Sequence, residues 1–373
     1  MNDITIAAET FHAGEFLKEE LESRGWSQAE LAEIIGRPTQ AISEIVLGKR
    51  GVTPETAKGL AAAFGTSAEY WMNLETAYQL SKATIQEVAV RQRAKLYAKF
   101  PVKQIVKRGW IEYSENSVVL EQRFLEFFGI SEIDETPRCS YAGKKQNYSS
   151  SSMMQIAWVK RVEQLATIVH AKKYDKSKLQ ELFAELRNRR QFVDSIREIP
   201  ALLANYGIRF VIVEPIPGMK MTGVCTWLDK NSPVIGLALT YDRIDNFWFT
   251  LFHELDHIEH EEGQGTPILD DLAPNKNDAG EPEIEKRANV RASQECVEDK
   301  EIAGFIARVN PLFTLEQIKG FAKRLGIHPG IVVGQLHGRG SFHYSLHRSV
   351  LEKIRGHIVG VALTDGYGSR LQV

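Results

Sequence analysis

Two histidines and the glutamate between them have the spacing of a hydrolytic metal site. In the pentapeptide His253-Glu254-Leu255-Asp256-His257 the histidines are four residues apart, so on a helix they lie one turn apart on the same face. Two imidazoles in this arrangement can bind one zinc ion (Zn²⁺), and Glu254 is the candidate catalytic base for hydrolysis of a peptide bond. This short pattern is incomplete without a third protein ligand.

The third ligand is expected on a later helix. Glu285 and Asn289 are again four residues apart, so Glu285 can complete the zinc site while Asn289 accepts a hydrogen bond from a ligating histidine. Glu283 is the alternative ligand, but its register does not pair it with Asn289. His260 would point too far along the first helix to close a tetrahedron, and we expect it on the surface. The residue that stabilises the substrate oxygen is left open among four candidates: Tyr241, His328, His337 and His343.

The elements that must position these residues indicate a mainly α fold with a small antiparallel β-sheet (α+β). Runs rich in Val, Ile and Thr predict strands at 209–214, 222–227 and 233–240, and the last of them is expected to offer an edge for an extended substrate. Apolar residues predict that the first motif lies on a helix that begins near Asp245. The Gly-, Pro-, Asp- and Asn-rich segment 263–282 predicts a surface loop before the second helix.

Residues 10–82 predict a bundle of short helices that contains a helix-turn-helix unit. Ser27 and Glu30 have the spacing of a helix capping box, Gly36 falls at the tight turn, and Ile42 and Ile45 face the interior. The outer face of the second helix carries side chains able to contact base edges, and its surroundings carry side chains able to contact phosphates. The candidate base contacts are Thr39, Gln40, Ser43 and Glu44, and the candidate phosphate contacts are Gln28, Lys49 and Arg50.

The acidic side chains of this region favour a second interpretation, a helical bundle that binds only protein. A resemblance favours DNA binding instead, because the segment from Phe11 to Leu74 is very similar to HigA-type antitoxin repressors of the XRE helix-turn-helix family. The resemblance covers about residues 10–76. It implies a homodimer on a palindromic operator, with residues 39–44 of each copy in successive major grooves, and it implies a cognate toxin as a further partner.

A second resemblance covers about residues 195–350. The segment 247–257, Glu285 with Ala288-Asn289, and the segment 326–336 resemble the ImmA/IrrE metallopeptidase family. This implies a zinc endopeptidase whose substrate is a helix-turn-helix repressor, including this chain's own N-terminal half, in a stress, toxin–antitoxin or mobile-element response. The sequence departs from the family at two places. Asp256 replaces the usual glycine and adds a negative charge beside the metal, and residues 290–297 replace the family's apolar signature, which predicts different packing of the second helix.

These interpretations divide the chain into a DNA-binding domain (1–82), a helical intermediate region (83–194), a metallopeptidase domain (195–350) and a C-terminal tail (351–373). The stretch between Glu87 and Trp110 contains basic but no acidic side chains. It is either a solvated linker face or an auxiliary phosphate-binding surface. The basic residues are Arg91, Arg93, Lys95, Lys99, Lys103, Lys107 and Arg108.

The composition agrees with a cytoplasmic protein. The 373-residue chain has a formal net charge of −2, so DNA binding must depend on local charge, and no apolar run approaches the roughly 20 residues of a membrane helix. Its widely spaced cysteines, Cys139, Cys225 and Cys296, form no metal-binding pair. We expect an antitoxin-like transcription regulator with regulated proteolysis; the alternative is a non-catalytic antitoxin or repressor whose metallopeptidase-like domain is a sensor or interaction module.

Overall fold

The computed structural model describes residues 10–82, 87–137, 152–219, 221–264, 267–271 and 282–365. Contacts divide the chain into two compact units, Met1–Val88 and Ala89–Val373. Cys139 and most of the predicted loop at 263–282 lie outside the described residues. Among the helices in the described ranges, none combines the length and the hydropathy needed to cross a bilayer.

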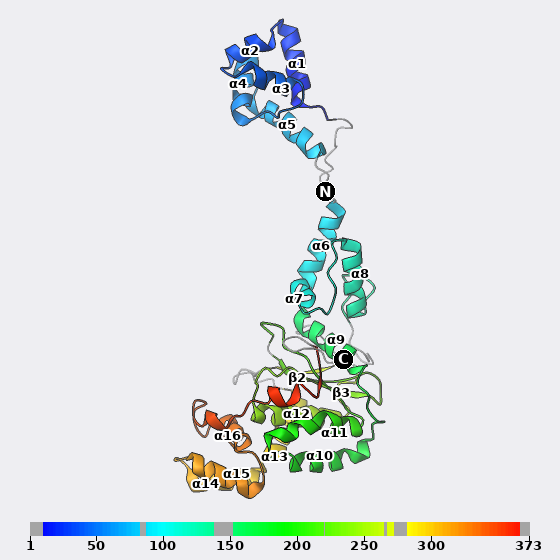
Figure 1. The fold of residues 1–373 in the computed structure, drawn as a ribbon, viewed down its shortest axis with the longest axis vertical. Coiled ribbons are helices and arrows are strands. Elements are labelled where there is room, and N and C mark those ends of the chain that lie inside the picture. The colour runs from blue at the N-terminus through cyan, green and yellow to red at the C-terminus, as the bar shows by residue number, and fades with distance from the viewer. Residues whose placement is uncertain are drawn as a thin grey trace. The chain divides into compact units, whose positions relative to one another are not determined.

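The N-terminal unit is a helical bundle (Figure 1). Its helices are α1 (Ala13–Arg24), α2 (Gln28–Ile34), α3 (Thr39–Val46), α4 (Pro54–Phe64) and α5 (Ala68–Lys82). Ser27 and Glu30 form the predicted capping box at the start of α2, and Gly36 has a φ of 66° at the turn before α3. A side chain is strained at this backbone angle, which explains the glycine there. Ile42 and Ile45 are buried as predicted.

The second unit begins with helices that extend the core of its sheet. They are α6 (Glu87–Lys99), α7 (Val102–Lys107), α8 (Ser117–Phe128) and α9 (Met153–Ala166). Phe100 stacks on Phe128 at 4.5 Å between ring centroids, and this aromatic cluster continues through α9 to the strands. Much of the stretch that we treated as an intermediate region, residues 83–194, therefore shares a buried core with the sheet.

The fold class is confirmed as mainly α with a small sheet, and the sheet is mixed. Its strands are β1 (Arg209–Ile212), β2 (Met221–Trp227), β3 (Pro233–Leu237), β4 (Ile268–Asp271) and β5 (Leu363–Thr364), in the order β4-β2-β3-β1-β5. β2 pairs antiparallel with β3, as expected, and also with β4, a strand inside the segment that we predicted to be a surface loop. β1 pairs parallel with β3 and β5, so the sheet is not purely antiparallel as predicted. The expectation that β3 is an edge strand is wrong, because β3 is hydrogen-bonded on both sides. β4 is an edge instead.

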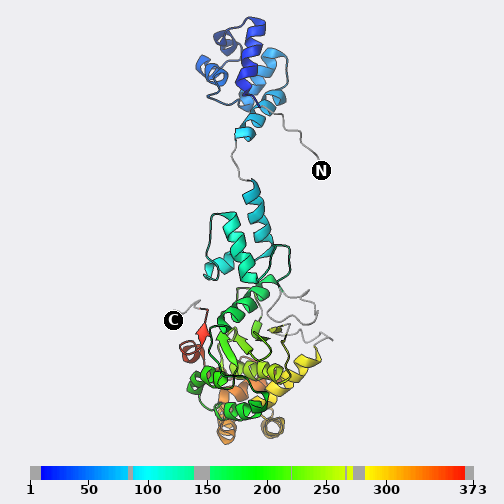
Figure 2. The ribbon, with the colours of Figure 1, turned by 90° about the vertical axis from the view of Figure 1, so that its right-hand side faces the viewer.

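The sheet lies between two helical layers, so its side chains alternate between two cores. Phe210 and Ile212 belong to the core beneath α12 (Ile244–Glu259), whereas Val211 and Val213 belong to the core beneath α9. Figures 1 and 2 show the cyan and teal helices on one side and the green, yellow and orange helices on the other. The remaining α-helices are α10 (Leu179–Asn188), α11 (Ile199–Asn205), α13 (Glu283–Cys296), α14 (Asp299–Val309), α15 (Leu315–Leu325), α16 (Pro329–Gly338) and α17 (Arg355–Ile358). The 3₁₀ helices are η2 (Lys176–Lys178), η3 (Val193–Glu198) and η4 (Arg348–Val350).

A buried ion pair joins the basic stretch to the residue after β5. Arg108 lies 3.5 Å from Asp365, and both side chains are almost completely buried. The Arg108 guanidinium also donates to the carbonyls of Glu214 and Pro215, at 2.8 and 2.6 Å. At least one residue of the basic stretch is thus structural, and the predicted tail contributes α17 and the edge strand β5.

Candidate metal centre and DNA-recognition helix

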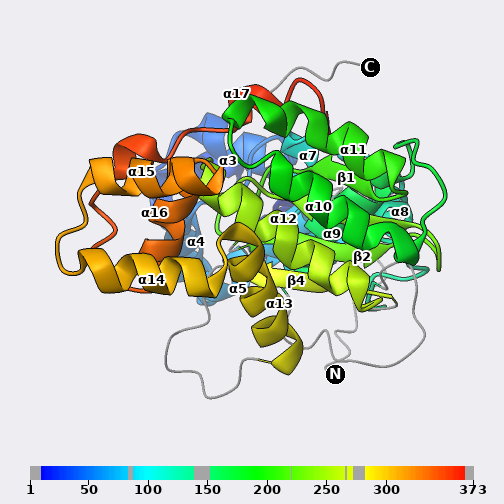
Figure 3. The same ribbon diagram turned by 90° about the horizontal axis from the view of Figure 1, so that it is seen from below.

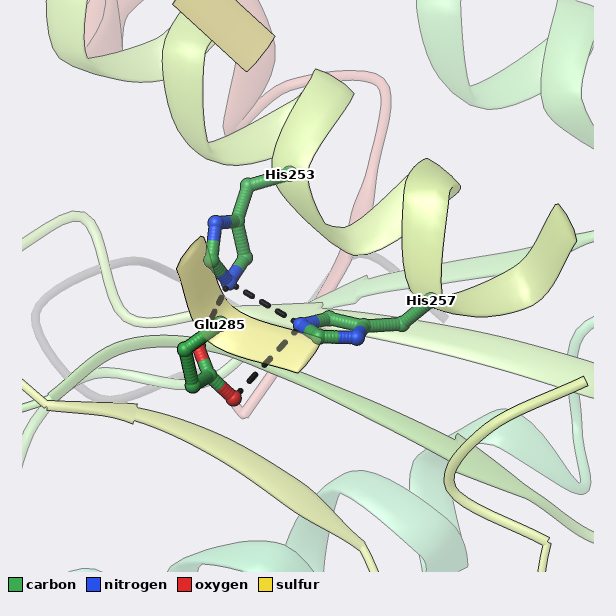
Figure 4. A group of neighbouring side chains, drawn as sticks. All are labelled: His253, His257 and Glu285. Carbon is green, nitrogen blue, oxygen red and sulfur yellow. Dashed lines mark hydrogen bonds and ion pairs between the residues drawn. The ribbon is translucent and has the colours of Figure 1, made fainter. Parts of the chain in front are cut away.

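Helices α12 and α13 bring together three side chains that could hold a metal ion. His253 and His257 extend from α12 and Glu285 from α13, and one donor atom of each lies within 4.8 Å of the others (Figure 4). The two Nε2 atoms are 3.0 Å apart, and the Glu285 carboxylate oxygens lie 3.2 Å from His253 Nε2 and 3.7 Å from His257 Nε2. Both histidines are completely buried.

The donor set fits a zinc ion. His253 Nδ1 lies 3.0 Å from Asn289 Oδ1, and His257 Nδ1 lies 2.7 Å from Glu262 Oε2. Because these oxygens only accept hydrogen bonds, each Nδ1 carries a proton and each Nε2 presents a lone pair. Two lone pairs facing each other at 3.0 Å repel unless a cation or a proton lies between them. Donors on a tetrahedral zinc ion are about 3.3 Å apart, given zinc–nitrogen bonds of about 2.0 to 2.1 Å.

Sequence reasoning identified Asn289 as a supporting residue but missed Glu262. Glu262 accepts hydrogen bonds from His257 and from two nitrogens of Arg287, at 3.0 and 2.5 Å. Arg287 also donates to Asp256 at 2.8 Å. Asp256 is the residue that departs from the metallopeptidase pattern. It therefore positions Arg287 by a hydrogen bond, and Arg287 in turn positions Glu262. This chain of contacts orients the His257 ring.

The local electrostatics favour the ligand form of His257. Burial lowers the pKa of His257, and the hydrogen bond to Glu262 opposes this effect only in part. Burial alone would raise the pKa of Glu262, but hydrogen bonds from Arg287 and His257 outweigh it, so the pKa lies below its usual value. A neutral imidazole beside an ionised carboxylate is the combination that binds a metal ion best.

Glu254 belongs to α12, and its side chain faces strand β2 of the sheet. Its side chain is completely buried, and its carboxylate is packed against Gly223 of β2 so closely that a Cβ atom at Gly223 would overlap Glu254 Oε1. A Cβ there would also lie 2.9 Å from Thr250 Cγ2. Gly223 is thus required for β2 to approach the carboxylate, a requirement that the strand pattern does not reveal.

The alternative ligands lie away from this cluster. Glu283 is 87% exposed and pairs with Lys286 at 2.8 Å, whereas Glu285 joins the two histidines. His260 is a half-exposed residue whose Nδ1 donates to the Asp256 carbonyl at 2.8 Å. This exposure agrees with the surface position predicted for His260.

The four candidates for stabilising the substrate oxygen have different surroundings. His328 caps α16 by accepting from the Gly330 amide at 3.1 Å, and the exposed His343 lies 2.8 Å from Ser345 Oγ. His337 is buried and donates to the Leu346 carbonyl at 3.1 Å. Tyr241 is exposed, and it lines a cavity that is also lined by Phe249 of α12.

Helix α3 presents most of the predicted base contacts to solvent. Thr39 and Gln40 are exposed, and Ser43 and Glu44 are half-exposed. Gln40 Nε2 donates to Glu44 Oε1 at 3.0 Å, and Arg50 Nε lies 3.2 Å from Glu44 Oε2. Glu44 therefore joins a predicted base contact to a predicted phosphate contact, and its negative charge is balanced by a neighbouring cation.

Gln28 and Lys49 complete the predicted set. Gln28 is half-exposed at the first turn of α2, and Lys49 is exposed in the segment after α3. That segment is held from inside the bundle, because the buried Glu75 accepts a hydrogen bond from the Val52 amide at 3.0 Å. Glu75 also lies 4.0 Å from His12 Nε2. Sequence reasoning missed this buried pair, whose two members lie on α5 and at the N-cap of α1.

The N-terminal domain, about a fifth of the chain, is similar to known proteins. The helix-turn-helix family matches residues 17–71. The chain is 42% identical over 73 residues to virulence-associated protein I of Dichelobacter nodosus, a match that covers 19% of this chain and 68% of that protein. It is 31% identical over 70 residues to the uncharacterized HTH-type transcriptional regulator YddM of Escherichia coli (strain K12), covering 19% of this chain and 74% of that protein. Among solved structures, the Pseudomonas aeruginosa antitoxin HigA with the higBA promoter is 35% identical and has a TM-score of 0.19, covering 20% of this chain and 80% of that chain. Through its N-terminal domain the chain belongs to the helix-turn-helix family.

Proposed function

We propose that the protein is an antitoxin-like transcription regulator that binds operator DNA through α3 and hydrolyses a protein substrate at a zinc centre in its second unit. One observation carries the hydrolytic part. Two buried histidines and a glutamate converge at the helix that also carries the buried Glu254, and the Nδ1 atom of each histidine has an oxygen partner.

The residues of the second unit have separate roles in this proposal. His253, His257 and Glu285 hold the zinc ion, which when bound polarises the scissile carbonyl group. Glu254 accepts a proton from the water that attacks the carbonyl carbon, and it passes this proton to the amine that leaves. The edge strand β4 supplies main-chain groups to which an extended substrate can pair.

The N-terminal unit supplies the DNA-binding part. Membership of the helix-turn-helix family and the exposed polar side chains of α3 support major-groove recognition. A homodimer would place two copies of α3 on a palindromic operator. The similarity to the antitoxin HigA suggests a toxin as a further partner. The metallopeptidase resemblance suggests a helix-turn-helix repressor as the substrate.

Paired variants separate metal binding from hydrolysis. Glu285→Gln removes a ligand charge, whereas Glu283→Gln removes an exposed charge two residues away and serves as the control. We expect bound zinc, measured by elemental analysis, to fall only in Glu285→Gln. Glu254→Gln should keep its zinc and lose cleavage of helix-turn-helix proteins encoded beside this one. Equal zinc with no cleavage by either the wild type or Glu254→Gln would instead support the sensor or interaction module. Absence of zinc from the wild type would refute the metal centre.

A further inference from the structure

A cavity of about 640 Å³ lies beside the metal-binding cluster, within the size range of ligand pockets. It is lined by residues of α12, α13 and α16, which pack against one another (Figure 3). Phe249 lines the cavity, and its ring centroid is 6.3 Å from that of His253. Ser293, another lining residue, is one helical turn after Asn289. The cavity therefore begins about one turn from the histidine that binds the metal, within reach of a residue next to a scissile bond.

The walls of the cavity suit a neutral aromatic group. Tyr241, Phe249 and Tyr344 supply three aromatic rings, and Ile331 adds an apolar surface. The charged side chains at the cavity are already paired. Arg243 forms two hydrogen bonds with Asp245, and Arg339 is paired with Asp299. A charged occupant would have to compete with these ion pairs, whereas a neutral ring would pack against the aromatic walls.

One lining residue is a buried, neutral histidine. His337 is 2% exposed, and its Nε2 donates to the Leu346 carbonyl at 3.1 Å. The Nδ1 atom of the same ring is therefore an acceptor, and it has no hydrogen-bond partner among the described residues. Burial lowers the pKa of His337, which keeps the ring neutral. Because this nitrogen is itself buried, His337 gives the cavity a neutral wall and no group for hydrogen bonding to an occupant.

We propose that this cavity binds the side chain of a substrate residue next to the scissile bond and prefers a neutral aromatic side chain. This inference rests on the proposed peptidase function. It adds the specificity of the site, because Tyr241, Phe249 and Tyr344 select the ring.

Two glycines provide a matched pair of variants. Gly338 lines the cavity at the end of α16, and a Cβ atom built on it meets nothing within 4 Å. Gly320 of α15 is equally open but does not line this cavity. Gly338→Leu should therefore add a side chain at the cavity wall without a steric clash, and Gly320→Leu controls for adding the same side chain to a helix.

Hydroxamates, which bind zinc without being cleaved, serve as the probes. Acetohydroxamate tests the metal centre alone, and peptide hydroxamates carrying Tyr, Phe or Ala on either side of the hydroxamate test the cavity. We expect the zinc-loaded protein to bind the Tyr probe about tenfold more tightly than the Ala probe in at least one series, measured by calorimetry. Gly338→Leu should abolish this preference, and Gly320→Leu should keep it. The Phe probe should show the same preference over the Ala probe, because the aromatic ring is what the cavity selects.

The outcomes separate this inference from the proposed function. If acetohydroxamate binds and Tyr and Ala probes bind equally, or if Gly338→Leu leaves the preference unchanged, the cavity assignment is wrong and the metal centre stands. If zinc-loaded wild type binds no hydroxamate, the hydrolytic centre fails and the assignment fails with it. A third outcome would also overturn the assignment. If N-acetyltyrosinamide binds the zinc-free protein and Gly338→Leu blocks this binding, while Tyr and Ala hydroxamates bind the zinc-loaded protein equally well, the cavity is a pocket for a free small molecule.

Discussion

Replacing Glu262 by glutamine tests whether the residues behind His257 tune the metal centre. The variant keeps the size of the side chain but removes its negative charge. In the wild type this carboxylate accepts one hydrogen bond from His257 and two from Arg287. The amide of the variant has only one oxygen to share among these three donors, so at least one of them loses its partner.

The expected effect is a weaker metal site in an intact fold. Loss of a partner that orients a ligating histidine costs about 10- to 100-fold in metal affinity, which corresponds to about 1.4 to 2.7 kcal/mol. The effect should lie in the upper part of this range, because Glu262 loses both its charge and its contact with a ligand. Glu259→Gln is the control. Its wild-type carboxylate, at the end of the same helix, contacts Gln180 and Arg291.

Competition with a fluorescent zinc chelator measures the affinity, and circular dichroism confirms the fold. We expect Glu259→Gln to match the wild type and Glu262→Gln to release zinc at a lower chelator concentration. Equal affinity of all three proteins would refute the idea that Glu262 supports His257. Equal weakening in both variants would show that only the total charge near the helix end matters.

Three further predictions concern other parts of the chain. Gly223→Ala should lower peptide hydrolysis about tenfold or more with zinc content unchanged, because the added Cβ displaces Glu254; zinc loss in parallel would contradict this. Arg108→Met should lower the free energy of unfolding of the second unit by about 3 to 5 kcal/mol in urea titrations, because Asp365 is left buried without its cation; an unchanged midpoint would contradict it. Gln40→Ala and Ser43→Ala should each reduce discrimination between operator and unrelated DNA by about 1 to 3 kcal/mol in binding titrations, and uniform weakening on all duplexes would argue against base recognition.

The regular helices explain why so much of the metal centre could be predicted. His253 and His257 lie within α12, and Glu285 and Asn289 lie within α13, so the spacing of each pair determines the face on which it lies. Glu262 follows the end of α12, where Glu261 has a φ of 56° and the Glu262 amide bonds back to the His257 carbonyl at 2.9 Å. No periodic pattern describes that turn, so the contact between Glu262 and His257 could not be predicted.

The same limit applies to the sheet. The Val-, Ile- and Thr-rich runs predict β1, β2 and β3 because each is long enough to show the composition of a strand. β5 has only two residues, and its pairing of Val211 with Leu363 depends on chain segments far apart in sequence. The parallel strands and the central position of β3 therefore emerge only from tertiary structure. The helix-turn-helix unit depends on local caps and a tight turn, which is why its boundaries follow from its sequence.

The ion pair between Arg108 and Asp365 also has a consequence for biosynthesis. Its members are 257 positions apart, and the sheet edge formed by β5 immediately precedes the second of them. The N-terminal bundle can fold as soon as α5 has left the ribosome, whereas the second unit must wait for Asp365 to be made. Translation thus imposes an order on the two units. The helix-turn-helix domain is complete while the second unit still has an unfinished sheet and an arginine without its carboxylate.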